Sequence, residues 1–90
     1  MIGAFPLGRV VATPGALELL QETGEDPLYY LARHRSGDWG ELDLHDRQEN
    51  ELSLQHGWRI VSSYPLGEKT VWIITEADRS VTTILLPEEY

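Results

Sequence analysis

The stretch WRIVSSYPLGEKTVWIITEADRSVTTILL, residues 58–86, decides the fold. It contains three runs rich in β-branched and aromatic residues, at 58–65, 70–76 and 81–86, separated by short polar segments. Such runs are typical of strands, and the short breaks between them are typical of hairpin loops. Alternate residues of the middle run point to opposite sides, and both sets are largely apolar, which indicates a central strand that is covered on at least part of each side. We therefore expect an antiparallel β-meander.

The chain upstream of residue 58 carries helix signals. Thr13-Pro14 and Asp26-Pro27 each combine an N-cap residue with a proline suited to the first helical position. Gly24 and Gly57 are placed where a glycine commonly ends a helix, and the segment 42–55 has a polar, helix-friendly composition. These signals predict three short helices.

The β-branched run at 7–13 is expected to add a strand to one edge of the sheet. Ninety residues are enough for one domain with one core. The sequence therefore predicts a single domain, 1–90, of the α+β class: an antiparallel β-meander of three to four strands with three short helices packed on one face.

The composition excludes several classes of chemistry. There is no cysteine, which removes disulfides, thiolate nucleophiles and cysteine-based metal sites. The start, residues 1–6, lacks the basic segment and apolar stretch of a signal peptide, and no apolar run approaches the length of a membrane span. We expect a cytoplasmic protein without membrane contact.

The charge balance is strongly acidic. Fifteen acids against seven bases give a formal net charge of −8. Such a domain repels nucleic-acid phosphates and is steered toward basic protein surfaces. The alternative is that the acidity serves solubility alone.

The acids are densest between residues 41 and 51, in a segment expected to be largely helical, and Asp38 precedes this run. Carboxylates spaced along a helix imitate rows of phosphates or engage an Arg- and Lys-rich partner. They equally suit a solvated helix face with acids near its N-terminus. The residues predicted to bind a partner are Asp38, Glu41, Asp43, Asp46 and Glu49.

A second cluster, Glu76-Ala77-Asp78-Arg79-Ser80, lies between the last two predicted strands. Asp and Ser favour tight turns because their side chains bond nearby amides, so one interpretation is a capped hairpin tip. The functional alternative has Glu76 as a general base, Arg79 stabilising a developing anion, and His34 brought close as a catalytic acid. Turn chemistry favours the first interpretation.

Metal and cofactor signals are lacking. The three histidines are eleven residues apart, and none is paired with another at metal-ligand spacing. There is no Gly-rich phosphate loop and no nucleophile elbow. We expect no cofactor and no metal.

Three blocks, LGRVVATPGALELL, LARHRSGDWGELD and WIITEADRSVTTILLPEEY, resemble a group of small uncharacterised proteins from bacterial plasmids, integrative elements and phages. The resemblance covers roughly residues 7–90. It implies a mobile-element context, in which small acidic proteins often inhibit host defence as anti-restriction or anti-CRISPR factors that occupy a nucleic-acid-binding surface.

A second resemblance is to barnase-like and EndoU-like ribonucleases, in which helices precede an antiparallel meander. It implies Glu76, Arg79 and His34 as catalytic candidates and Arg59 as a phosphate contact. The chain departs from that pattern because its last predicted strand has no histidine and its net charge is acidic. Our leading hypothesis is therefore a non-enzymatic module that binds a basic surface of a host protein without direct contact to nucleic acid. A homodimer through an exposed sheet edge is a further possibility.

Overall fold

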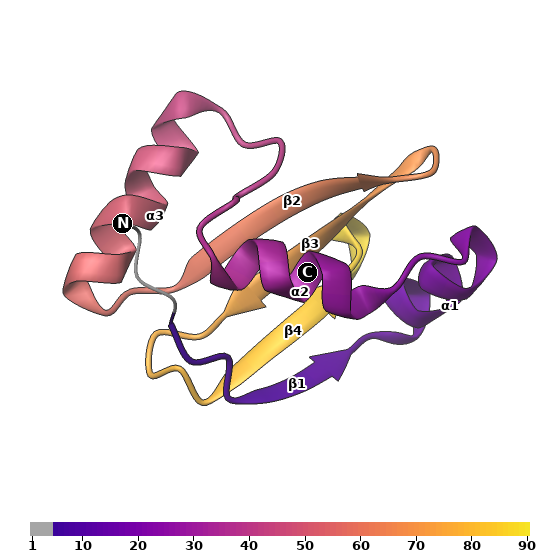
Figure 1. The fold of residues 1–90 in the computed structure, drawn as a ribbon, viewed down its shortest axis with the longest axis horizontal. Coiled ribbons are helices and arrows are strands. Elements are labelled where there is room, and N and C mark those ends of the chain that lie inside the picture. The colour runs from indigo at the N-terminus through magenta and orange to yellow at the C-terminus, as the bar shows by residue number, and fades with distance from the viewer. Residues whose placement is uncertain (1–4) are drawn as a thin grey trace.

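The computed structural model describes residues 5–90 and confirms the α+β class (Figure 1). The first four residues, which form part of the segment examined for a signal peptide, lie outside the described residues. Among residues 5–90, no helix is both long and apolar enough to cross a membrane. The elements are β1 (Arg9–Ala12), α1 (Pro14–Thr23), α2 (Pro27–Arg35), α3 (Leu44–His56), β2 (Ile60–Leu66), β3 (Lys69–Thr75), β4 (Val81–Leu85) and a 3₁₀ turn η1 (Pro87–Glu89).

The four strands form one sheet in the order β1-β4-β3-β2. The last three strands make the expected antiparallel meander. β1 lies at the edge, as expected, but it runs parallel to β4, so the sheet is mixed. The reason is that α1, α2 and α3 carry the chain from β1 to β2, at the opposite edge of the sheet, before the meander begins.

The helix signals in the sequence act as predicted. The Thr13 hydroxyl accepts a hydrogen bond from the Ala16 N–H and caps α1, while the Asp26 carboxylate caps α2. Gly24 and Gly57 both adopt the left-handed conformation that ends α1 and α3. Local sequence chemistry therefore accounts for where the helices begin and end.

The helices α1 and α2 cover one face of the sheet, which we call the closed face (Figure 1). The middle strand contributes Val71, Ile73 and Thr75 to this face, each at most 1% exposed. Burial of such aliphatic side chains against the two helices is the main source of stability. The apolar core on this face comprises Ala16, Leu19, Leu20, Tyr30, Leu31, Tyr64, Leu66, Val71, Ile73, Ile84 and Leu86.

The third helix departs from the expected arrangement because α3 lies beside the free edge of β2. The Asn50 amide donates to the Val61 carbonyl at 2.7 Å and accepts from the Val61 N–H at 3.1 Å. The segment before α3 adds a short parallel bridge between Gly40 and Ser63 on the same edge. With α3 at the edge, no helix of residues 5–90 lies across the second face of the sheet, here called the open face (Figure 1).

Candidate functional site

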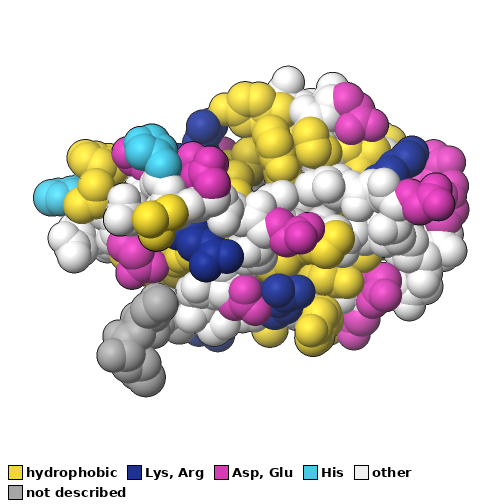
Figure 2. Space-filling model, turned by 90° about the horizontal axis from the view of Figure 1, so that it is seen from above, with side chains coloured by type: hydrophobic (Ala, Val, Ile, Leu, Met, Phe, Trp, Pro, Cys, Tyr) yellow, Lys and Arg dark blue, Asp and Glu magenta, His cyan; other side chains and the backbone are white. Residues whose placement is uncertain are grey.

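The open face of the sheet forms the floor of a groove of about 850 Å³. Its floor consists of side chains from the two strands β2 and β3 that point away from α1 and α2. Figure 2 shows a band of hydrophobic side chains along one side of the molecule, with acidic and histidine side chains beside it. The floor residues are Val61, Ser63, Trp72 and Ile74.

Acidic side chains form one wall of this groove. Four of the five acids predicted to bind a partner lie on it: Glu41, Asp43, Asp46 and Glu49. All four are exposed. Asp43 is also the N-cap of α3, because its carboxylate accepts from the Asp46 N–H at 2.8 Å. The beginning of α3 therefore gathers negative charge at the rim, where the helix dipole stabilises it.

Aromatic side chains also line this groove. The Arg59 guanidinium lies 5.3 Å from the centre of the Tyr90 ring and donates to the Tyr90 hydroxyl at 2.5 Å. The Tyr90 ring meets Trp72 edge-on, with ring centres 5.9 Å apart, and Trp58 is 49% exposed. We call this groove, which is lined by both acids and aromatic rings, the acid–aromatic groove.

This arrangement suits a cationic ligand. An Arg or Lys side chain can rest its apolar stem on aromatic rings while its charged end faces carboxylates. The Arg59–Tyr90 pair shows that the groove already accommodates a guanidinium against a ring. Three aromatic rings in the groove are exposed or half-buried. Aromatic residues contribute much of the binding energy at protein interfaces.

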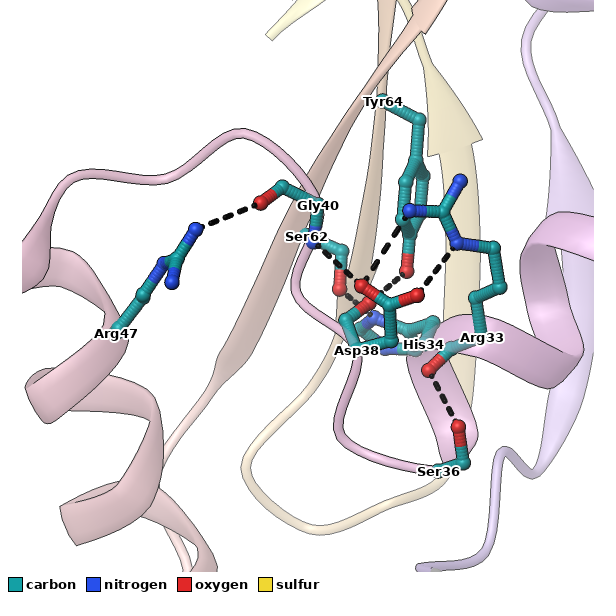
Figure 3. Close-up of polar contacts among 8 residues, drawn as sticks. All are labelled: Arg33, His34, Ser36, Asp38, Gly40, Arg47, Ser62 and Tyr64. Carbon is teal, nitrogen blue, oxygen red and sulfur yellow. Dashed lines mark hydrogen bonds and ion pairs between the residues drawn. The ribbon is translucent and has the colours of Figure 1, made fainter.

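Asp38, the fifth predicted binding residue, does not line the acid–aromatic groove. Figure 3 shows it beside Arg33. Its carboxylate makes a two-point contact with Arg33, with N–O distances of 2.7 and 3.3 Å. The Arg33 guanidinium in turn lies 4.6 Å from the centre of the Tyr64 ring. The hydrogen bond from Arg33 lowers the pKa of Asp38 below its ordinary value. Asp38 therefore holds the loop after α2 in place.

His34, the predicted catalytic acid of the alternative function, is fully buried under the closed face. The Thr82 hydroxyl uses its one proton to donate to the Leu7 carbonyl at 2.7 Å. In the bond between the Thr75 and Thr82 hydroxyls, also 2.7 Å long, Thr75 is therefore the donor. The Thr75 oxygen then accepts from His34 Nε2 at 2.9 Å, and Nδ1 accepts from the Ser62 hydroxyl at 2.5 Å. These bonds place a proton on Nε2, and Nδ1 accepts from Ser62 when the imidazole is neutral.

Burial lowers the pKa of His34 to about 4, with a smaller contribution from the positive charge of Arg79. Figure 3 shows the imidazole beside Ser62, behind the Arg33–Asp38 pair. The histidine is thus an uncharged structural link between α2 and the sheet, without access to a substrate.

The segment from Glu76 to Ser80 is a capped hairpin turn. The Asp78 carboxylate accepts from both the Ser80 N–H, at 3.0 Å, and the Ser80 hydroxyl, at 2.6 Å. The Arg79 N–H closes the turn onto the Glu76 carbonyl at 2.9 Å, with Arg79 in the left-handed region at φ 62°. The interpretation favoured by turn chemistry therefore describes this segment.

The guanidinium of Arg79 acts as a structural clamp. It donates to the Trp58 carbonyl at 2.7 Å and to the Ser53 carbonyl at 3.2 Å, which ties the β3–β4 turn to the end of α3. Glu76 is exposed, and His34 is buried. The structure therefore does not bring the three alternative catalytic residues around one cleft. Arg59, the suggested phosphate contact, lies in the groove on the opposite face of the sheet from His34.

One group of potential metal ligands occurs at the start of α3. Ligand atoms of Asp43, His45 and Asp46 all lie within 4.8 Å of one another, and all three side chains are exposed. Asp43 is already used as the helix cap, and His45 lies 3.7 Å from Glu49. These residues are typical of an exposed polar helix end and do not indicate a metal site.

The sequence predicted the acids of the groove but not its aromatic residues. Trp58, Trp72 and Tyr90 are spread over 33 positions, and the fold brings them together with α3. One signal was present: Trp72 alternates with the buried Val71 and Ile73, so it had to face the other side of the sheet.

No family model matches the chain, and comparison with curated proteins and with solved structures finds no match.

Proposed function

We propose that this protein is a non-enzymatic interaction module whose acid–aromatic groove binds a basic, Arg- or Lys-rich segment of a host protein. The observation that carries the proposal is that four carboxylates line the same groove as Trp58, Trp72 and Tyr90. A net charge of −8 adds long-range attraction for a basic partner.

The context suggested by the resemblance to mobile-element proteins gives the partner a biological class. A basic surface that contacts nucleic acid is the natural target of an acidic inhibitor, because carboxylates can replace the phosphates that the surface normally binds. The proposed role is inhibition of a host defence protein, of the anti-restriction or anti-CRISPR kind, by occupation of its nucleic-acid-binding surface.

The test is a binding titration with an arginine-rich peptide, followed through tryptophan fluorescence, because Trp58 and Trp72 both line the groove. The groove variant replaces Glu41, Asp46 and Glu49 with Gln, Asn and Gln. We expect its dissociation constant to rise at least tenfold, since each lost charge-assisted contact is worth on the order of 1 kcal/mol.

A matched control separates the groove from general charge attraction. Replacing Glu18, Glu22 and Glu68 with Gln removes the same number of exposed carboxylates at positions that do not line the groove. The control should bind nearly as tightly as the wild type. Equal weakening in both variants would show that the overall charge, and not the groove, attracts the peptide.

The same two variants then test the partner class in host lysate. The wild type and the control should capture one nucleic-acid-binding protein that the groove variant does not. Addition of RNA or DNA should compete with the capture, because the proposed partner uses one surface for both. Capture that is unchanged in the groove variant would contradict the proposal.

A further inference from the structure

The two edges of the sheet are treated differently. On the β2 edge, Ser63 accepts from the Glu41 N–H at 2.7 Å and donates to the Trp39 carbonyl at 3.1 Å, and Asn50 satisfies both backbone groups of Val61. On the β1 edge, no other residue within 5–90 pairs with the outer side of the strand. Native proteins usually cover or block a sheet edge, so we expect the uncovered β1 edge to pair with another strand.

The backbone of β1 presents a defined set of hydrogen-bonding groups to that partner. Arg9 and Thr13 donate their N–H groups inward, to the carbonyls of Ser80 and Ile84. Because alternate residues of a strand face opposite edges, the N–H and C=O groups of Val10 and Ala12 point outward. The free edge therefore offers two donors and two acceptors.

An apolar hollow of about 420 Å³ lies on the same edge. It is lined by side chains of β1, α1 and α2, and every residue that lines it is uncharged. Three of these side chains are markedly exposed for their type: Val10 at 43%, Leu17 at 49% and Leu28 at 69%. Backbone groups and apolar side chains together suit an extended, uncharged strand.

The charge distribution indicates which chain supplies the strand that pairs with β1. Two chains that each carry a net charge of −8 repel one another unless they meet where carboxylates are absent, and the β1 edge is such a place. A basic partner gains nothing from this apolar hollow, and Arg9 at the start of β1 repels it, whereas the acids of the other groove attract it. In a second β1, the residues Val10, Val11 and Ala12 have the small apolar side chains that the hollow accepts, and Arg9 precedes them outside the hollow.

We propose that β1 pairs with β1 of a second copy of this chain, antiparallel and about a two-fold axis. The Val10 groups of one copy bond the Ala12 groups of the other, and Val11 faces its own counterpart on the axis. This register uses all four outward groups in each copy and joins the two sheets into one of eight strands. The exposed Leu17 and Leu28 supply apolar contact beyond the short strand.

The experiment is sedimentation equilibrium of the full chain with two edge variants and one control. Val10→Pro removes an outward N–H without touching the bonds to β4, and Leu28→Glu places a carboxylate in the hollow. Leu44→Glu makes the same change at a side chain that is equally exposed, at 71%, but lies on α3. The wild type and Leu44→Glu should be dimers, and both edge variants should dissociate at least tenfold more readily.

Amide hydrogen exchange gives a second measurement that does not depend on any variant folding. In the dimer the amides of Val10 and Ala12 should exchange more slowly as the protein concentration rises. The amide of Val11, which faces β4, should not respond to concentration. A chain that is monomeric at high concentration, a dimer unaffected by both edge variants, or equal concentration dependence at all three amides would overturn the proposal.

Discussion

The two faces of the sheet use polar side chains in opposite ways. On the closed face, Ser62, His34, Thr75 and Thr82 are buried in one continuous hydrogen-bonded chain. Within residues 5–90 no buried side-chain nitrogen or oxygen lacks a partner. On the open face, the carboxylates of the acid–aromatic groove are exposed, and within residues 5–90 those of Glu41, Asp46 and Glu49 accept no hydrogen bond from an amide.

This difference between the two faces indicates which polar side chains are available for binding. Polar groups that are fully satisfied inside a protein stabilise one arrangement and have nothing left for a ligand. The histidine, which chemical reasoning from the sequence selected as a catalytic acid, belongs to that class. Exposed carboxylates beside exposed aromatic rings keep their bonding capacity, and for this reason we propose that a partner binds the open face, while the closed face supplies stability.

The largest expected effect contrasts two neighbouring residues of β3. Ile73 faces α1 and α2 and is completely buried, whereas Trp72 faces the groove and is partly exposed. Ile73→Ala should lower the free energy of unfolding by about 4 kcal/mol through lost burial and the cavity left behind. Trp72→Ala should cost less than half as much stability, yet it should weaken peptide binding at least tenfold.

Urea unfolding and the peptide titration, carried out on both variants, check this contrast. Trp58 still reports peptide binding when Trp72 is absent. If Ile73→Ala is too unstable to study, Ile73→Val should still show a loss of about 1 kcal/mol with unchanged binding. Similar stability losses at the two positions would break the distinction between the faces.

The second prediction concerns acid and His34. Its pKa is about 4 in the folded protein, compared with 6.5 as its ordinary value, so between these values the unfolded chain binds a proton that the folded chain does not. Stability from this group is therefore complete above pH 6.5 and declines as the pH falls toward 4, by about 3 kcal/mol in total. Urea unfolding at a series of pH values measures the decline.

The control variants assign that decline to the imidazole. His34→Gln retains hydrogen-bonding capacity without a titrating ring, and it should lose most of the pH dependence between 6.5 and 4. Ile73→Val is destabilised without losing a titrating group, so its pH dependence should match that of the wild type. A slope that is the same in His34→Gln and the wild type would mean that other groups cause the loss.

Local signals in the sequence were sufficient for the secondary structure and insufficient for the placement of the elements. The caps at Thr13 and Asp26 and the stops at Gly24 and Gly57 depend on a few adjacent residues, so they could be predicted. The parallel direction of β1 and the position of α3 depend on contacts between distant segments. Asn50 illustrates this: in a polar run it is expected to be solvated, but it is buried against the edge of β2.

The same division applies to the candidate site. Charge density along the chain located the acids at positions 41–49, because clustering of one charge is visible in the sequence. It also included Asp38, which pairs with Arg33 instead, and it gave no indication that His34 turns inward between two arginines. Pairing and side-chain direction are tertiary properties, and composition does not encode them locally.

The smallest expected effect concerns Asp43, which has both a structural role and a place in the proposed binding site. Asp43 caps α3 and also lines the acid–aromatic groove. Asp43→Ala should lose about 1 kcal/mol of unfolding free energy, whereas Asp43→Asn should lose little, because asparagine is an equally good N-cap. Both variants remove the carboxylate charge, so both should weaken peptide binding by a similar, few-fold factor.

Urea unfolding and the fluorescence titration measure the two roles separately. If Asp43→Asn bound like the wild type while Asp43→Ala did not, the cap would be the whole contribution of Asp43, and recognition would rest on Glu41, Asp46 and Glu49.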